Sequence, residues 1–388
     1  MPVHDFDLND PTISAAEGDA ELAALRAGCP LAQLPAMTSH PDRPVFVATS
    51  DEAVRAVVAS SDLSALTEHS GTAQLADRGE AAPSPALLFE HDGNEHLDHR
   101  RALIPLLGPR AARAWEPRAR ELAAERVRTL RPRGQCDAVP EIAAHVTWQL
   151  TGALLGIPAG QQAQFTELAG KTFASPDNTE AEAAFDQLLL DHIAHLRRDP
   201  GDDVISAMLP LPAAEDTAAL RRYAKIISAA SSLTTVDTLA NALLHLAQDP
   251  ALADQARTDP AVLVPLTDEI VRTQPAAPHT GRRTTTDTVL AGQPVPAGAT
   301  VVLSWRAAAT DPAVHDAPQE VRLDRRLGDH AGWGRGPHRC IGRELAMVTV
   351  PAVLEEVLRG LPDLALGGVV HRRNGYQNIP HLPLRWTP

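Results

Sequence analysis

The chain has 388 residues and a net charge of −14, with 44% hydrophobic and only 3% aromatic residues. This is the composition of an ordinary globular protein, long enough for a large core of alanine and leucine, which favours helices. An acidic chain without a basic tract is not expected to bind nucleic acid. No run is apolar enough to span a membrane, and the polar N-terminus does not resemble a signal peptide. The three cysteines predict a reducing cytoplasm and no disulfide framework.

Periodicity and capping residues predict mostly helices, with short strands near both ends of the chain. Residues 1–40 are expected to form a loose N-terminal segment, and residues 41–388 a single domain. The predicted elements are, in chain order, a helix at Ala20–Arg26, a strand at Pro44–Thr49, helices at Asp51–Ala59 (capped by Ser50 or Asp51), Glu95–Leu107, Pro109–Leu130, Val139–Leu155, Gln161–Phe173, Glu180–Arg197, Tyr223–Ala247 and Ala261–Thr273, a hairpin-like β segment at Val289–Val302, a helix at Arg343–Arg359 with a kink at Pro351, and a strand at Leu384–Trp386.

A glycine-rich loop near the C-terminus carries the strongest signal, in the ten residues WGRGPHRCIG that begin at Trp333. Three glycines, one histidine and one cysteine at these spacings recur by chance at fewer than about two start positions in a million. The glycines permit positive φ and a close approach to a flat ligand. Cys340 would then stand among backbone N–H groups at a helix N-terminus, which favours a thiolate. A cysteine thiolate is a recognised axial ligand of haem iron; the alternative is a buried structural cysteine.

This loop and four further motifs resemble those of the bacterial cytochromes P450, which are haem-thiolate monooxygenases, over nearly the whole chain. The resemblance implies a mainly α fold with small β-sheets, in which haem b (iron protoporphyrin IX) lies between a long distal helix and a proximal loop. Cys340 would be the iron ligand. The resemblance also implies a monomer that receives electrons from a ferredoxin and a ferredoxin reductase.

Four residues resemble the family's partners for the haem propionates. His96 and Arg100 are four residues apart and would share one face of a helix. Arg282, with Arg283 as the second choice, lies in a segment similar to the propionate-binding strand. His338 stands two residues before Cys340. Each of these side chains alone would also fit a solvated surface.

Glu269 and Arg272 match the family's Glu-x-x-Arg motif, which implies a structural ion pair. The third member of that ion cluster is left open, because Glu320 occupies the usual arginine position and Arg322 lies two residues further on. Trp333 replaces the usual phenylalanine before the loop, and its indole N–H could bond to the cysteine sulfur.

The long central helix contains a hydroxyl-rich run, Ser231-Ser232-Leu233-Thr234-Thr235. The resemblance places Thr234 on the family's catalytic threonine, and Ser231 where a glycine is usual. Mid-helix hydroxyls compete with a regular ladder, so a bent helix that holds waters is expected. Leu233 replaces the acid that serves the proton relay in the family. Ser231, Ser232, Thr234 and water, or a group of the substrate, could relay protons instead.

The resemblance also implies a substrate pocket for a small organic molecule, and a docking face for the electron donor. Below the segment Ser64–Ser84, which is variable in the family, the pocket residues are expected to include Leu87, Leu88, Ile227, Ala230, Ala277 and His279. His279 could instead merely cap the local turn. The docking face would be the arginine ring of the loop, Arg335, Arg339 and Arg343, with Arg100 and Arg101 nearby. Alternatively, some of these arginines would pair with the propionates and the rest would be solvated.

Three functions are compatible with these patterns. The first is a monooxygenase of bacterial secondary metabolism. The second is the same scaffold with atypical chemistry, such as peroxide-driven oxidation, oxidative coupling or dioxygen-independent group transfer, and Leu233 is its support. The third is a haem carrier or sensor without turnover, against which the hydroxyl-rich run counts.

Overall fold

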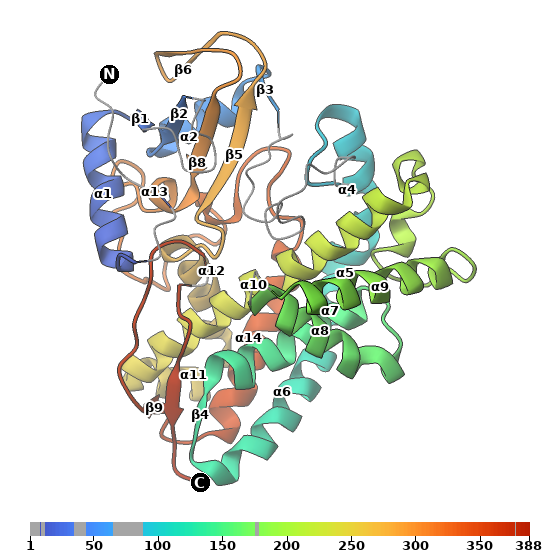
Figure 1. Ribbon diagram of the computed structural model, residues 1–388. Coiled ribbons are helices and arrows are strands. Elements are labelled where there is room, and N and C mark those ends of the chain that lie inside the picture. Colours follow the sequence, from blue (N-terminus) through green and yellow to red (C-terminus); the bar gives the residue numbers. More distant parts are fainter. Residues whose placement is uncertain (1–7, 9–11, 35–43, 65–87, 175–177, 377) are drawn as a thin grey trace. The chain divides into compact units, whose positions relative to one another are not determined.

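The computed structural model describes residues 8, 12–34, 44–64, 88–174, 178–376 and 378–388 (Figure 1). The chain divides into two compact units. Unit 1 comprises Met1–Gly71, Asp268–Cys340 and His371–Pro380, and unit 2 comprises Thr72–Thr267, Ile341–Val370 and His381–Pro388. The segment Ser64–Ser84 and the expected pocket residue Leu87 lie outside the described residues, with the exception of Ser64. Among the residues described, no helix combines the length and apolar character of a membrane span.

Unit 1 is built on a five-stranded sheet with the order β1-β2-β8-β5-β3. Among the described strands of this sheet, β2 and β8 pair in parallel, and the other pairs are antiparallel. The strands are β1 (Leu31–Leu34), β2 (Val45–Ala48), β3 (Leu63–Ser64), β5 (His279–Thr284) and β8 (Thr300–Ser304), and a separate hairpin joins β6 (Thr288–Leu290) to β7 (Gln293–Val295). Side chains of β2 alternate between two cores, as the period of a strand requires. Val45 and Val47 pack with α1 (Ala15–Gly28), while Phe46 packs with α2 (Asp51–Ala59) and α13 (Trp305–Ala309).

Unit 2 is mostly helical. Its helices are α4 (Gly93–Leu107), α5 (Pro109–Ala114), α6 (Glu116–Leu130), α7 (His145–Leu154), α8 (Gln162–Ala174), α9 (Thr179–Leu196), α10 (Thr217–Gln248), α11 (Pro250–Thr258) and α14 (Arg343–Gly360); α12 (Leu263–Thr273) crosses the boundary between the units. A small sheet has the order β4 (Gln135–Asp137), β10 (Pro383–Arg385) and β9 (Ala365–Leu366). Aromatic rings hold α7, α8 and α9 together: Trp148 stacks on Phe173 at 5.6 Å between centroids, and Phe165 and Phe185 are also 5.6 Å apart.

The mainly α fold with small sheets is confirmed, and four details differ from the sequence predictions. The single helix predicted over Pro109–Leu130 is two helices that meet at Trp115, because Pro117 has no N–H to continue the ladder. The first turns of the helix predicted at Val139–Leu155 are wider, π-type turns over Val139–Ala144. Within the segment Val289–Val302, only β6 and β7 form a hairpin, while β8 pairs with β2 and β5.

The fourth difference concerns the central helix. α10 runs from Thr217 to Gln248 and so begins before the predicted start at Tyr223, while the bend expected at its hydroxyl-rich run stays a prediction. The hydroxyls of Thr234 and Thr235 each donate to the carbonyl four residues earlier, at 2.7 and 2.8 Å. Both hydroxyls are therefore satisfied on α10 itself, by a type of bond that often accompanies a bend in a helix.

Candidate active site

The cysteine loop of unit 1 is shaped by two glycines. Gly334 has φ 73° and ψ 176°, a region open essentially to glycine alone, and Gly336 has φ 68°. A Cβ atom on Gly336 would overlap Cγ1 of Val58, so that position also lacks space for a side chain. The Cys340 N–H donates to the Trp333 carbonyl at 2.9 Å and closes the loop. Three residues after Cys340, α14 begins at Arg343.

The three cysteines differ in accessibility, and only Cys340 is exposed. Cys136 is buried, and burial, with the nearby Glu141 carboxylate, raises the pKa of its thiol to about 12. The Cys29 thiol is half-buried and donates to the Leu31 carbonyl at 3.1 Å. Cys340 is therefore the thiol best placed to bind a metal. One cysteine supplies one ligand, which fits an iron whose other ligands come from a porphyrin.

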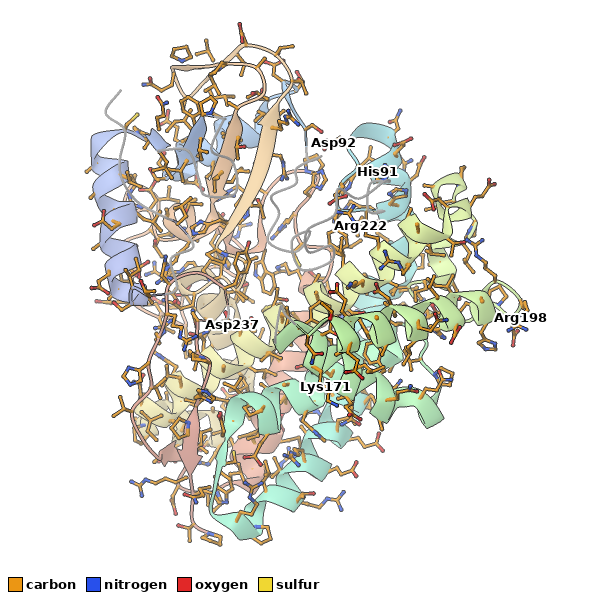
Figure 2. The ribbon with its side chains drawn as sticks, viewed as in Figure 1. His91, Asp92, Lys171, Arg198, Arg222 and Asp237 are labelled. Carbon is orange, nitrogen blue, oxygen red and sulfur yellow. The ribbon has the colours of Figure 1, made fainter. Side chains whose placement is uncertain are left out.

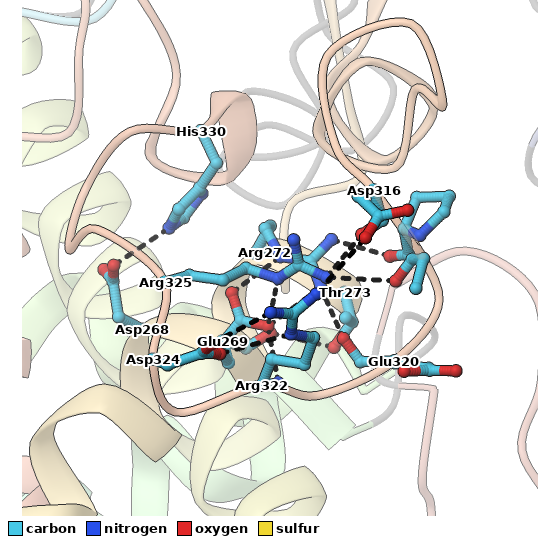
Figure 3. Close-up of polar contacts among 12 residues, drawn as sticks. Asp268, Glu269, Arg272, Thr273, Asp316, Glu320, Arg322, Asp324, Arg325 and His330 are labelled. Atoms are coloured by element: carbon cyan, nitrogen blue, oxygen red, sulfur yellow. Dashed lines mark hydrogen bonds and ion pairs between the residues drawn. The ribbon is translucent and has the colours of Figure 1, made fainter.

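Trp333, at the start of the loop, is fixed by a carboxylate. Its indole Nε1–H donates to Oδ1 of Asp268 at 2.7 Å, rather than being left to the cysteine sulfur. Asp268 also accepts from the Gly328 N–H at 2.5 Å and lies 3.3 Å from Nε2 of His330 (Figure 3). Burial opposes ionisation of Asp268, but His330, Trp333 and Gly328 outweigh it and lower the pKa of the carboxyl group.

The predicted pair of Glu269 and Arg272 forms at the centre of a buried polar cluster (Figure 3). Arg272 donates to both carboxylate oxygens of Glu269, at 2.7 and 2.9 Å. It also donates to three backbone carbonyls, those of Ala309, Pro318 and Glu320. The open third position is filled by Arg325, whose Nε donates to Glu269 at 3.2 Å.

Arg322, the other candidate for the third position, contributes its backbone. Its N–H donates to Glu269 at 2.9 Å, while its guanidinium pairs with the exposed carboxylates of Asp316 and Asp324. The cluster therefore fixes the segment 316–325 on α12, in the same unit as the cysteine loop.

On α10 in unit 2, Ser231 and Thr234 are both half-buried. Both hydroxyls donate to the carbonyl four residues earlier: Ser231 to Ile227 at 2.6 Å, and Thr234 to Ala230 at 2.7 Å. Leu233, at the position of the missing acid, packs against the apolar core of unit 2. No analogous carboxylate therefore stands at that position.

Sequence reasoning missed Thr151 of α7. Its hydroxyl lies 2.8 Å from the hydroxyl of Ser232 and 3.1 Å from that of Ser231. No signal marks this contact in the sequence, because the partners are about eighty residues apart.

His96 is buried near the start of α4 and is fixed by the chain just before it. Its Nδ1 lies 2.8 Å from the carbonyl of Leu88, and the N–H of Leu88 donates to Nδ1 of His99 at 2.9 Å. Leu88 itself has φ 71°, which is unusual for a bulky residue. The expected pocket residue Leu88 and the expected propionate partner His96 are therefore neighbours.

Two residues after Leu88, Glu90 forms a buried bidentate ion pair with Arg222 of α10, which is labelled in Figure 2.

The remaining predicted partners are placed as follows. Arg100 is half-buried on α4, one turn after His96. Arg282 is half-buried on β5 and donates to the Gly281 carbonyl at 2.7 Å, and Arg283 follows it on the same strand. His338 is half-buried in the cysteine loop.

The arginine ring is partly engaged within each unit. Arg335 donates to the buried Asp51 at 2.6 Å, and Arg339 donates to the Gly328 carbonyl at 3.3 Å. Arg343 pairs with its neighbour Glu344. Arg101 of α4 is exposed and pairs with Asp98.

The expected pocket residues are divided between the units. Ile227 and Ala230 lie on α10 in unit 2, and Ala277 is half-buried just before β5 in unit 1. His279 is buried on β5. Burial and the nearby Arg306 lower the pKa of its imidazole to about 3. A hydrogen bond with the Leu8 backbone acts in the opposite direction but is outweighed. His279 is therefore a neutral ring held by the core of unit 1.

Comparisons with known proteins identify the class to which this site belongs. The cytochrome P450 family model matches residues 214–361. A putative cytochrome P450 126 of Mycobacterium tuberculosis is 31% identical over 310 residues, which are 75% of this chain and 75% of that protein. The mycinamicin IV hydroxylase/epoxidase of Micromonospora griseorubida is 29% identical over 311 residues, 77% of this chain and 76% of that one.

Among solved structures, CYP108D1 from Novosphingobium aromaticivorans matches with a TM-score of 0.84 and 25% identity, over 98% of this chain and 97% of that one. P450 OxyD, described as involved in the biosynthesis of vancomycin-type antibiotics, matches in fold with a TM-score of 0.85 and 23% identity, over 98% and 99% of the two chains. The chain belongs to the cytochrome P450 family. It is an oxidoreductase whose cofactor is haem.

Proposed function

We propose that this enzyme is a haem-thiolate monooxygenase that inserts one atom of dioxygen into a small organic substrate, in bacterial secondary metabolism. The observation that carries the proposal is the exposed Cys340 thiol at the end of a loop shaped by two left-handed glycines. The names of relatives support the pathway class, since they include an erythromycin C-12 hydroxylase and a cyclomarin C epoxidase.

When bound, haem would supply the redox-active iron, and the chain would hold and tune it. Cys340 is the proposed iron ligand, and His96, Arg100, Arg282 and His338 are the proposed propionate partners. The contact of His96 Nδ1 with the Leu88 carbonyl requires a proton on Nδ1. His96 can therefore donate from Nε2 to a propionate only as an imidazolium, which also adds a compensating positive charge.

Thr234 is the proposed residue that hands protons to dioxygen, with Ser231 one turn earlier. The Thr234 hydroxyl donates to the Ala230 carbonyl, so its oxygen is available to accept a further hydrogen bond. Ile227, Ala230, Leu88, Ala277 and His279 remain the proposed pocket residues, His279 being the weakest of them because of its burial. We further propose a cytoplasmic monomer that takes electrons from a ferredoxin and its reductase, docked at the arginine ring.

The test is a carbon monoxide difference spectrum of the reduced, haem-loaded protein, compared with Cys340→Ser. The red-shifted Soret band of thiolate-bound iron is expected in the wild type and not in the variant. Wild-type protein that contains haem but lacks this band would refute Cys340 as the ligand and the proposal with it.

A second candidate is atypical chemistry on the same scaffold, such as peroxide-driven oxidation, oxidative coupling or group transfer without dioxygen. The specific observation in its favour is Leu233, which is half-buried and packs against an apolar core at the position where the family has an acid. Turnover that proceeds with peroxide alone, or without dioxygen, would select this candidate. A strict need for both reductant and dioxygen would select the first.

A further inference from the structure

Three hydroxyls on α7 and α10 form an ordered chain. Ser231 donates to the Ile227 carbonyl at 2.6 Å, so its oxygen must accept in its 3.1 Å contact with Thr151. Thr151 therefore donates to Ser231 and accepts from Ser232 at 2.8 Å. The direction of every bond follows: Ser232 to Thr151, Thr151 to Ser231, and Ser231 to Ile227.

This arrangement is unusual for α10. The hydroxyls of Ser228, Thr234, Thr235 and Thr238 each donate to the carbonyl four residues earlier on the same helix. Ser232 instead reaches across to another helix, and both it and Thr151 are buried, with 0% and 3% of their surface exposed. A hydroxyl chain in such a dry place is polarised strongly along its length.

One turn before Thr151 on α7 lies a second buried threonine. Thr147 is 2% exposed, and its hydroxyl has no hydrogen-bond partner among the residues that the structure describes. Residues four apart on a helix are neighbours, so Thr147 and Thr151 lie on the same face of α7. A buried hydroxyl without a partner is costly, and such groups are usually satisfied by an ordered water.

We propose that Thr151 is a positioning residue for proton delivery, which holds Ser231 and Ser232 in a hydroxyl chain completed by a water at Thr147. This inference rests on the proposed function, and it gives a route that does not need an acid at Leu233. A proton would enter from the water at Thr147, Thr151 would accept it and pass its own proton to Ser231, and Ser231 would release its own in turn, while Ser232 holds Thr151 in place. From Ser231 the proton would pass to Thr234, the proposed catalytic residue one turn further along α10, once the Ser231 hydroxyl leaves the Ile227 carbonyl. One proton moves and no electrons are transferred within the chain.

The first test measures proton delivery without a known substrate. Haem-loaded protein is reduced with dithionite and mixed with air-saturated buffer, and the rate of return to the ferric state is measured in H2O and D2O. Thr151→Val, which keeps the shape and removes the hydroxyl, is expected to slow this rate about tenfold and to change its solvent isotope effect. Thr151→Ser is expected to restore both. Thr349→Val is the matched control, because Thr349 is equally buried and donates only to its own helix at Leu345.

The second test is independent of turnover. A high-resolution crystal structure of the haem-loaded protein should show a water about 2.8 Å from the Thr147 hydroxyl that is also hydrogen-bonded to the hydroxyl of Thr151, the middle member of the chain. Thr147→Val should lose this water. If Thr151→Val does not fold, Thr147→Val also serves in the kinetic test, with an effect in the same direction.

The outcomes separate the two proposals. A normal carbon monoxide spectrum with an unchanged isotope effect in Thr151→Val would overturn the relay alone. A loss of thermal stability in Thr151→Val without a change in the solvent isotope effect would also overturn the relay. The hydroxyls would then serve only to join the two helices. Absence of a water at Thr147 would overturn the same inference. A wild-type protein without the thiolate spectrum would instead refute the function on which it rests.

Discussion

Trp333 donates its indole N–H to Asp268 at 2.7 Å, and this bond joins the start of the cysteine loop to α12. The next residue along α12 is Glu269, the centre of the Arg272 and Arg325 cluster. Two successive carboxylates therefore hold different segments of unit 1: Asp268 the cysteine loop, and Glu269 the segment before it. In this chain the glutamate of the Glu-x-x-Arg motif therefore acts together with the aspartate before it, and the two carboxylates fix two neighbouring segments of unit 1 to α12.

We expect Asp268→Ala to lower the free energy of unfolding by about 2–5 kcal/mol, because it leaves the buried N–H groups of Trp333 and Gly328 without an acceptor. Asp268→Asn keeps one carbonyl oxygen and should cost less. Urea denaturation followed by circular dichroism measures both. Equal losses in the two variants would show that the hydrogen bonds are not the source of the stability.

Replacing either arginine that binds Glu269 should lower the free energy of unfolding, by more for Arg272 than for Arg325. Arg272 is 1% exposed and makes five hydrogen bonds, so Arg272→Ala, which also leaves Glu269 partly uncompensated, is expected to cost about 3–5 kcal/mol. Arg325→Ala, at a more exposed position with one bond to Glu269, should cost less. The measurement is the urea midpoint together with haem content per chain. The reverse order would contradict the central role of Arg272.

The stability of the protein should fall in acid partly because of His99. Burial, and then the nearby His91 and His96, lower the pKa of its imidazole to about 4 from an ordinary value of 6.5. The unfolded chain therefore takes up the proton first, and the stabilisation is complete above pH 6.5 and is lost as the pH falls toward 4. The loss attributable to this residue is at most about 3 kcal/mol.

His99→Asn is the matched variant for this effect, because an amide oxygen can still accept the Leu88 N–H but does not titrate. The decline of the unfolding free energy between pH 6.5 and 4 should be smaller in the variant. Comparing the two proteins cancels the contribution of the other histidines whose pKa is also lowered, which are the half-buried His145 and the buried His192, His279 and His315. If the unfolding free energies of the wild type and of His99→Asn declined equally over this pH range, His99 would not be a cause of the acid destabilisation.

The cysteines should differ in their reaction with iodoacetamide. At pH 8 a thiol with a pKa of about 12 is ionised to only about one part in ten thousand, so Cys136 should stay unmodified in the folded protein. Cys340 should react first in haem-free protein and be protected by haem, which peptide mass spectrometry measures. Protection of Cys29 by haem in place of Cys340 would contradict the proposed ligand.

Short-range features could be predicted from the sequence. The helix at Asp51–Ala59 has the predicted bounds, and the Ser50 side chain caps it by accepting from the Ala53 N–H. The pair of Glu269 and Arg272 follows from a spacing of three on a helix. Two of the three glycines of the cysteine loop, Gly334 and Gly336, have the expected positive φ, whereas Gly342 has φ −83°. Each of these depends on residues a few positions apart, where local geometry decides.

What could not be predicted depends on contacts between distant segments. Arg325 joins Glu269 across more than fifty residues, and nothing distinguishes it from Arg322 before the chain is folded. The contact of Thr151 with Ser231 and Ser232 on α10 could not be predicted for the same reason. One miss was avoidable: Asp249 followed by Pro250 is a standard helix start, and α11 begins there with the Asp249 side chain accepting from the Leu252 N–H.

The three residues 88–90 have a consequence for protein engineering. The backbone of Leu88 is held from both sides by His96 and His99, and Glu90 is locked to Arg222. These bonds fix the chain immediately before α4 whatever precedes it. Because these bonds involve only Leu88 and the residues after it, Leu88 is a suitable junction for exchanging the sequence that precedes it. A library of new sequences that ends at this position should leave the bonds of Leu88 and Glu90 to α4 and α10 intact.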